Sequence, residues 1–182
     1  LIPERDHYTL CISSQVGCAQ DCGFCLTAQM GFQRNLSWAE IVSQVRDIKN
    51  DLKDPMSLTN LVFMGMGEPL ANYQNLVAAI RIITDGHCGF GFAGRRVTVS
   101  TAGLASRLAD LGRDTRVSLA VSLNATDNDT RSRLMPINRK FPIEKLLEAC
   151  RHFPLRGGRR ITFEYVLLKD VNDSADDARR LA

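Results

Sequence analysis

Cys18-Ala-Gln-Asp-Cys22-Gly-Phe-Cys25 is a C-x₃-C-x₂-C segment that brings three cysteines into one short loop. Three thiolates so close in sequence can converge only if the loop wraps a single centre, and Gly17 and Gly23 give the backbone the freedom to do so. Thiolates are ligands of both iron–sulfur clusters and zinc. A structural zinc site needs four closed ligands, whereas a cubane held by three cysteines leaves one iron open to a substrate. The segment therefore predicts a metal centre and favours an open cubane.

The remaining cysteines are Cys11, Cys88 and Cys150, so four of the six lie between residues 11 and 25. A disulfide framework would spread its cysteines along the chain, whereas a local cluster in a reducing compartment indicates metal binding or catalysis. Cys11 keeps two alternatives open. As a fourth ligand it would complete a zinc knuckle or the cluster of a ferredoxin-like electron carrier.

Composition is ordinary for a soluble globular domain. The chain has 182 residues, of which 45% are apolar and 24% charged, and a net charge of +3 that permits an anionic partner without requiring one. It contains no run of 18 apolar residues and opens on no signal-like segment, so we expect a cytoplasmic protein without membrane contact. The first residue is not Met, and the last residues fall inside a helix expected to begin after Ser174. We therefore expect residues 1–182 to be one core domain of a longer protein, truncated at both ends.

Expected strands and helices alternate along the chain. Ser37 and Glu40 form a capping box at the start of the first long helix, and Gly112 is expected to end a later one. Apolar runs predict the strands, and apolar spacing of three and four predicts the helices. The expected strands cover residues 8–13, 61–66, 97–101, 117–123 and 161–168, and the helices begin near residues 38, 73, 104 and 142.

This alternation predicts an α/β fold with a parallel sheet and outer helices. Five strands are too few to close an eight-stranded barrel, so a partial barrel and an open doubly wound sheet both fit. In either fold ligands bind beyond the carboxyl ends of the strands. The loops at that edge are expected at residues 14–36, 67–73, 101–103, 124–141 and 169–174.

Two of these loops follow strands with groups that could bind a ligand. Gly65-Met66-Gly67-Glu68-Pro69-Leu70 is not a dinucleotide loop, because Leu70 stands where the third glycine is needed. Backbone carbonyls near Gly67 and the Glu68 carboxylate could accept hydrogen bonds from an amino group. Ser100 and Ser122 end two strands, where their hydroxyls could bind a ligand or cap the next helix.

Six segments together resemble one family. The chain is similar to the RlmN and Cfr methyltransferases of the radical S-adenosylmethionine (SAM) superfamily. The segments that carry the likeness are TLCISSQVGCAQDCGFCLTAQMGFQR (9–34), GMGEPL (65–70), RRVTVSTAG (95–103), VSLNA (121–125), LMPINRKFPI (134–143) and ITFEYVLL (161–168). The resemblance implies a radical SAM partial (β/α)₆ barrel of the TIM type.

The resemblance also implies roles for individual residues. Cys18, Cys22 and Cys25 would hold a [4Fe–4S] cluster, Phe24 would lie near the adenine of SAM, and Cys11 would be a catalytic cysteine. The implied SAM contacts are Gly67, Glu68, Ser100, Ser122, Leu123 and Asn124. Many members of the family have His where this chain has Asn124, which puts any titrating role of that position in doubt.

The implied activity is transfer of a methyl group from SAM to C2 of an adenosine in 23S rRNA and tRNA. The Cfr branch methylates C8 instead, and other radical SAM activities, such as glycyl-radical activation, remain alternatives. In the family, a carrier cysteine expected beyond residue 182 is methylated first, and Cys11 would resolve the protein–RNA link with a disulfide left behind. The implied partners are ribosomal RNA, tRNA and a reducing electron donor such as flavodoxin. The protein itself is expected to be a monomer.

Basic residues offer possible RNA contacts. One set lies on loops at the expected active edge, where it could meet phosphates or be solvated. A second set precedes the last strand, at the opposite edge. The first set is Arg34, Arg131, Arg133, Arg139 and Lys140, and the second is Arg151, Arg156, Arg159 and Arg160.

Overall fold

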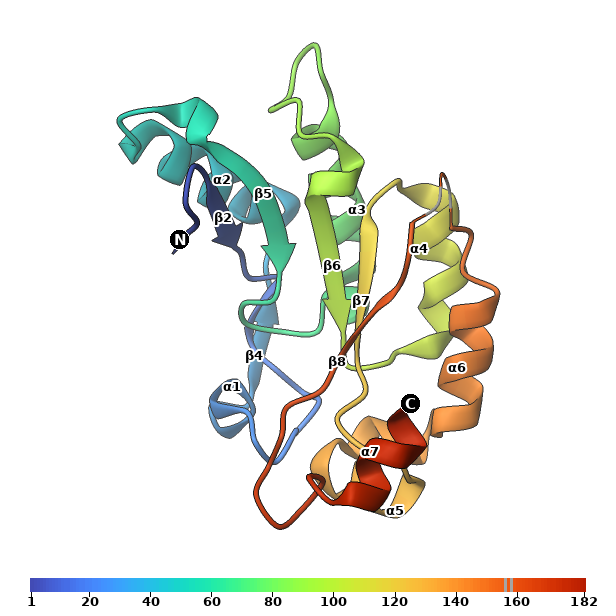
Figure 1. The fold of residues 1–182 in the computed structure, drawn as a ribbon. Coiled ribbons are helices and arrows are strands. Elements are labelled where there is room, and N and C mark those ends of the chain that lie inside the picture. Colours follow the sequence, from blue (N-terminus) through green and yellow to red (C-terminus); the bar gives the residue numbers. More distant parts are fainter. Residues whose placement is uncertain (156, 158) are drawn as a thin grey trace.

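A curled, mostly parallel sheet forms the centre of the computed structural model, which describes residues 1–155, 157 and 159–182 (Figure 1). The six strands follow the order β1-β2-β5-β6-β7-β8. Only β1 is antiparallel to its neighbour. The bounds are β1 (Ile2–Pro3), β2 (Tyr8–Cys11), β5 (Leu58–Phe63), β6 (Val97–Thr101), β7 (Ser118–Ser122) and β8 (Thr162–Glu164). All five expected parallel strands are present, although β5 lies three residues before the expected 61–66 and β8 is shorter than the expected 161–168. The curl makes the sheet a partial barrel rather than a flat doubly wound sheet.

Helices that follow the strands along the chain cover the outer face of the sheet (Figure 1). They are α2 (Trp38–Asp51), α3 (Tyr73–Thr84), α4 (Leu108–Asp114) and α6 (Ile143–Arg151). Their apolar stripes bury Ile41, Leu76 and Leu146 completely against the strand residues Leu61 and Val99. The expected capping box is confirmed, because Ser37 and Glu40 each accept a hydrogen bond from the other's backbone N–H.

Gly112 does not end its helix as the sequence predicts. It lies inside α4, which continues to Asp114. A Cβ atom at this position would lie 2.5 Å from the ring of Pro154 and 3.0 Å from Phe153. Close packing of the segment after α6, rather than helix termination, therefore accounts for the glycine.

The cysteine segment lies in a hairpin that the sequence did not predict. β3 (Gln15–Gly17) and β4 (Phe32–Asn35) form a separate two-stranded sheet, with the short α1 (Leu26–Gln29) between them. Gly17 has φ +75°, and a Cβ there would meet the carbonyl oxygen of Gly31 at 1.7 Å. Gly23 has no such requirement, since its φ is not positive and an added Cβ would meet nothing closer than 3.8 Å. The backbone freedom expected at both glycines is needed only at Gly17.

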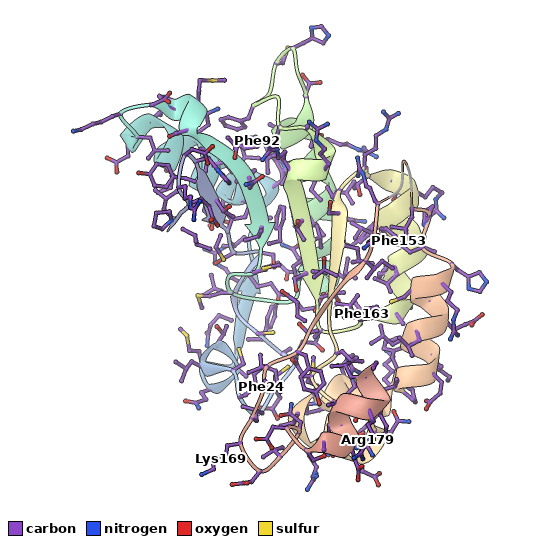
Figure 2. The ribbon with its side chains drawn as sticks, viewed as in Figure 1. Phe24, Phe92, Phe153, Phe163, Lys169 and Arg179 are labelled. Atoms are coloured by element: carbon purple, nitrogen blue, oxygen red, sulfur yellow. The ribbon has the colours of Figure 1, made fainter. Side chains whose placement is uncertain are left out.

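Other helices gather where the parallel strands end (Figure 1). They are α1, α5 (Asn128–Leu134) and α7 (Ala175–Leu181), and the capping box of Ser174 and Asp177 begins α7. Five 3₁₀ turns complete the described elements: η1 (Pro55–Ser57), η2 (Pro69–Asn72), η3 (Gly94–Arg96), η4 (Ala105–Arg107) and η5 (Pro136–Arg139). Figure 2 shows Phe24 at this end of the molecule and Phe92 at the opposite end. None of the described helices combines the length and apolar character that a membrane crossing requires.

Candidate functional site

A cavity of about 320 Å³ opens at the carboxyl ends of the parallel strands. We call it the cysteine cavity. It is lined by residues of the cysteine loop, of the ends of β5 to β8 and of the segment just before η5. They include Cys18, Cys22, Phe24, Cys25, Gly67, Glu68, Ser100, Thr101, Ser122, Asn124, Met135, Glu164 and Val166. The loops that the sequence predicted to share one edge therefore do so.

Three cysteines of the cavity are half-buried free thiols. Burial raises the pKa of Cys22 to about 12, and the nearby thiols of Cys18 and Cys25 add to this effect. Burial also raises the pKa of Cys18. Among the described residues, no three Cys, His, Asp or Glu side chains lie close enough together to hold a single metal ion. A structural zinc site needs four closed ligands, whereas the described lining of this cavity supplies three thiols.

Glu68 is a buried carboxylate whose two oxygens link neighbouring loops. Its Oε1 accepts hydrogen bonds from Leu70 N–H at 3.0 Å and from the Thr101 hydroxyl at 2.9 Å, and its Oε2 accepts one from Ala102 N–H at 2.7 Å. Burial raises the pKa of Glu68 in spite of these donors. An ionised carboxylate can accept about four hydrogen bonds, so Glu68 retains acceptor capacity toward the cavity.

Gln15 connects the turn that carries Glu68 to the cysteine hairpin. Its side-chain oxygen accepts a 2.9 Å hydrogen bond from Glu68 N–H, and its amide donates to Asn35 Oδ1 at 2.8 Å. Gly67 has φ +100°, and a Cβ there would lie 2.5 Å from Gln15 Cβ. The glycine is therefore required both by backbone conformation and by close packing, which places the cysteine loop beside Glu68.

Glu164 is a cavity residue that the sequence analysis missed. It lies on β8 directly opposite Ser122 on β7. Its Oε2 accepts hydrogen bonds from the Ser100 hydroxyl at 2.5 Å and from the Ser122 hydroxyl at 3.3 Å. The one available signal was a single acidic residue in the otherwise apolar and aromatic segment ITFEYVLL. Glu164 is half-buried on a strand whose other two residues are exposed, and the two serine hydroxyls are its polar partners.

Asn124 and Leu123 occupy different environments. Asn124 has φ +56°, in the left-handed region that Asn, Asp and His adopt more readily than other non-glycine residues. Its Oδ1 accepts from Val166 N–H at 2.8 Å and its amide donates to the sulfur of Met135 at 3.3 Å. Leu123 is buried and does not line the cavity. The left-handed backbone conformation therefore suits both the Asn of this chain and the His of the resembled family.

Arg131 does not lie on the surface as a possible phosphate contact. Its side chain is fully buried and donates to the carbonyl oxygens of Ala102, Ser122 and Leu123, and to Asn138 Oδ1, at 2.9–3.0 Å. Burial lowers the pKa of Arg131 to about 10. The expectation for Arg131 is therefore wrong, because this guanidinium fastens the ends of β6 and β7 beneath the cavity.

The other basic residues that could contact RNA differ in whether they lie at the cavity end of the molecule. Arg34 forms a two-point ion pair with Glu40, at 2.8 and 3.0 Å. Arg133, Arg139 and Lys140 are exposed on α5 and η5, at the cavity end. Figure 2 shows Lys169 at this end as well. Arg151, Arg159 and Arg160 lie outside the cavity lining, and Arg156 lies outside the described residues.

The three remaining cysteines do not line the cavity. Cys11 ends β2, and because Leu10 and Ile12 on either side are core residues, it faces the inner side of the curled sheet. Cys150 is buried on α6, and burial raises its pKa to about 11. Cys88 is exposed in the loop before β6, at the end opposite α1 (Figure 1). All six thiols are free, so no disulfide joins two cysteines of residues 1–182. The disulfide that the resemblance implies would pair Cys11 with the carrier cysteine expected beyond residue 182.

Comparison with known proteins agrees with this geometry. The family described as the Radical SAM superfamily matches residues 12–182, and the chain therefore belongs to that superfamily. Within it, the chain is 61% identical to a dual-specificity RNA methyltransferase RlmN from Desulfosudis oleivorans and 56% identical to one from Geotalea uraniireducens. These matches cover 100% of the chain and 49% and 51% of the two relatives, so the chain spans about half their length.

Superposition on a solved structure also supports the fold. The crystal structure of a radical SAM methyltransferase from Sphaerobacter thermophilus superposes with a TM-score of 0.89 and 45% sequence identity. The match covers 99% of this chain and 53% of that one. The implied partial barrel is confirmed by this likeness and by the curled sheet.

Proposed function

We propose that residues 1–182 are the core domain of a radical SAM methyltransferase that acts on RNA. One observation carries the proposal. Three free thiols, Cys18, Cys22 and Cys25, line one cavity with Glu68 and with the hydroxyls at the ends of β6 and β7. A metal-binding loop beside a ring of hydrogen-bond acceptors suits a cluster together with a ligand that carries an amino group.

The donor set fits a [4Fe–4S] cluster. Three thiols are available, and Cys11, the candidate fourth ligand, does not line the cavity. Cys18, Cys22 and Cys25 would hold such a cluster, which would supply the electron for the cleavage of bound SAM. Three thiols in the described lining, rather than four, support an open cubane over a closed zinc site.

The chain's own residues would hold SAM from several sides. Glu68 and the carbonyl of Gly67 would accept hydrogen bonds from its amino group, while Phe24 would contact the adenine. Ser100, Ser122 and Asn124 lie across the cavity from the cysteine loop, on the ends of β6 and β7. Leu123 would act indirectly, since its N–H donates to Glu164 O and its carbonyl accepts from Arg131.

We further propose an adenosine in RNA as the methyl acceptor, with C2 as the position and 23S rRNA and tRNA as substrates. The names of the relatives support this assignment, and C8 is the alternative. Cys11, on the inner side of the sheet, is the proposed catalytic cysteine. Exposed Arg133, Arg139 and Lys140 would meet RNA phosphates. We propose a flavodoxin-type electron donor, a monomer and a cytoplasmic location.

Analysis of modified nucleosides tests this function. The full-length protein, with its cluster reconstituted without oxygen, is incubated with SAM, a reductant and unmodified ribosomal RNA or tRNA. The expected product is 2-methyladenosine, identified by mass spectrometry against standards of the 2- and 8-methyl isomers. The control is Cys22→Ser, which should give none. 8-Methyladenosine would replace the C2 assignment by C8, and the absence of any methylated adenosine would overturn RNA methylation.

A further inference from the structure

Glu164 holds two hydroxyls from two different strands on one oxygen atom. Its Oε2 accepts from Ser100 on β6 at 2.5 Å and from Ser122 on β7 at 3.3 Å, while Glu164 itself lies on β8. The backbone fixes this arrangement, because Ser122 and Glu164 are register partners and the Glu164 carbonyl accepts from Leu123 N–H at 2.9 Å. All three side chains line the cysteine cavity.

This arrangement determines which hydrogen bonds the two serines can make to a ligand. A hydroxyl has one proton to donate and two lone pairs that accept. Because Ser100 and Ser122 donate their protons to Glu164, their oxygens face the cavity as acceptors only. The second oxygen of Glu164, Oε1, accepts no hydrogen bond from the described residues and is a third acceptor.

The charged groups of the cavity also favour a ligand that donates hydrogen bonds rather than one that accepts them. Its lining includes the carboxylates of Glu68 and Glu164 but, within the described part of the chain, no Lys, Arg or His. Two adjacent O–H donors on one ligand would match adjacent acceptors on β6 to β8. In dinucleotide-binding Rossmann folds, an acidic side chain accepts a hydrogen bond from a ribose hydroxyl in the same way.

We infer that Glu164 is the residue that recognises the ribose of SAM, by accepting from a ribose hydroxyl and by orienting Ser100 and Ser122 as acceptors for the diol. The inference rests on the proposed function, because it requires SAM as the ligand. It adds a residue on β8 to the expected contacts on β5 to β7.

Binding of SAM and its deoxy analogues tests the inference. Equilibrium dialysis without oxygen gives the Kd of the cluster-loaded protein for SAM and for the analogues that lack the 2′- or the 3′-hydroxyl. The unaltered protein should prefer SAM over at least one analogue by about tenfold or more, as expected for a hydrogen bond to a charged group. Glu164→Gln should reduce that preference to less than about threefold, because an amide presents one acceptor and one donor.

The ratio of two Kd values does not change with the fraction of protein that is folded, so a purely structural role would leave it intact. Ser100→Ala provides a second variant and should also reduce the preference. Glu148→Gln, at an exposed position on α6, is the matched control and should keep it. A tenfold preference retained in Glu164→Gln would overturn the role of Glu164 and leave the proposed function standing. No measurable SAM binding by the unaltered protein would overturn the proposed function as well.

Discussion

Glu68 accepts a 2.7 Å hydrogen bond from the backbone N–H of Ala102, which fastens the loop after β5 to the loop after β6. The same carboxylate accepts from Thr101 on β6 and from Leu70 in its own loop. Three donors therefore converge on one buried side chain at the edge of the cysteine cavity. Glu68 supports the shape of the site in addition to its proposed contact with SAM.

Glu68→Gln should destabilise the fold by about 1–3 kcal/mol, since an amide NH₂ would face a backbone N–H and leave a buried donor without a partner. Urea unfolding at neutral pH measures the change in the free energy of unfolding. Glu148→Gln makes the same chemical change at an exposed position and should fall within about 0.5 kcal/mol of the unaltered protein. Equal stability of the two variants would contradict the role assigned to Glu68.

Arg131→Met should destabilise the fold by roughly 2 kcal/mol or more, because it leaves buried carbonyl oxygens of Ala102, Ser122 and Leu123 without donors. Arg133→Met, two residues along the same helix but exposed, is the matched control and should change stability by less than about 0.5 kcal/mol. Thermal unfolding of both variants provides the comparison. If the two variants unfolded at the same temperature, the structural role assigned to Arg131 would be contradicted.

The C-terminal helix gives a prediction about pH. Hydrogen bonds from Ser174 and then from Thr126 hold the pKa of Asp177 well below its ordinary value of 3.8. A carboxylate whose pKa is lower in the folded state stabilises the fold above its unfolded pKa, and the stabilisation disappears as the pH falls through the folded value.

Asp177→Asn removes this effect. The unaltered protein should therefore be more stable than the variant at pH 7, and the difference should shrink as the pH falls below about 3.8. Urea unfolding at a series of pH values measures it. A difference that stays constant from pH 7 to pH 3 would show that Asp177 acts through packing rather than charge.

The sequence predicted the parts of the fold that depend on local pattern. Leu61 and Phe63 belong to the apolar run that predicted a parallel strand, and both are buried on one face of β5, while Val62 between them is half-buried. The Ser37 cap and the spacing of the three clustered cysteines are equally local. The shared edge of the cavity followed from the rule that parallel strands end together.

What the sequence did not predict depends on contacts between distant segments. β4 is exposed at every position, so no apolar alternation marks it as a strand. Gly112 resembles a helix end until Pro154 is seen packed against it. Arg131 lies in a basic stretch, and only the folded chain brings three carbonyls around it. The role inferred for Glu164 required the register of three strands.

The cluster ligands give a prediction about metal content. After reconstitution without oxygen, the unaltered protein should hold about four irons per chain. Cys22→Ser should lose them, while Cys11→Ala and Cys88→Ala should keep them, since neither side chain lines the cavity. Iron and sulfide analysis with the visible absorption spectrum checks this. Complete loss of iron in Cys11→Ala would make Cys11 a fourth ligand and leave no open iron.

Formation of 5′-deoxyadenosine tests most directly that the cysteine cavity binds a cluster and SAM together. The cluster-loaded protein is mixed with SAM and a strong reductant, and the product is measured by liquid chromatography and mass spectrometry. We predict 5′-deoxyadenosine above the level without protein, and none from Cys22→Ser. A protein with four irons that yields no 5′-deoxyadenosine, or a Cys22→Ser variant that yields as much as the unaltered protein, would contradict the account.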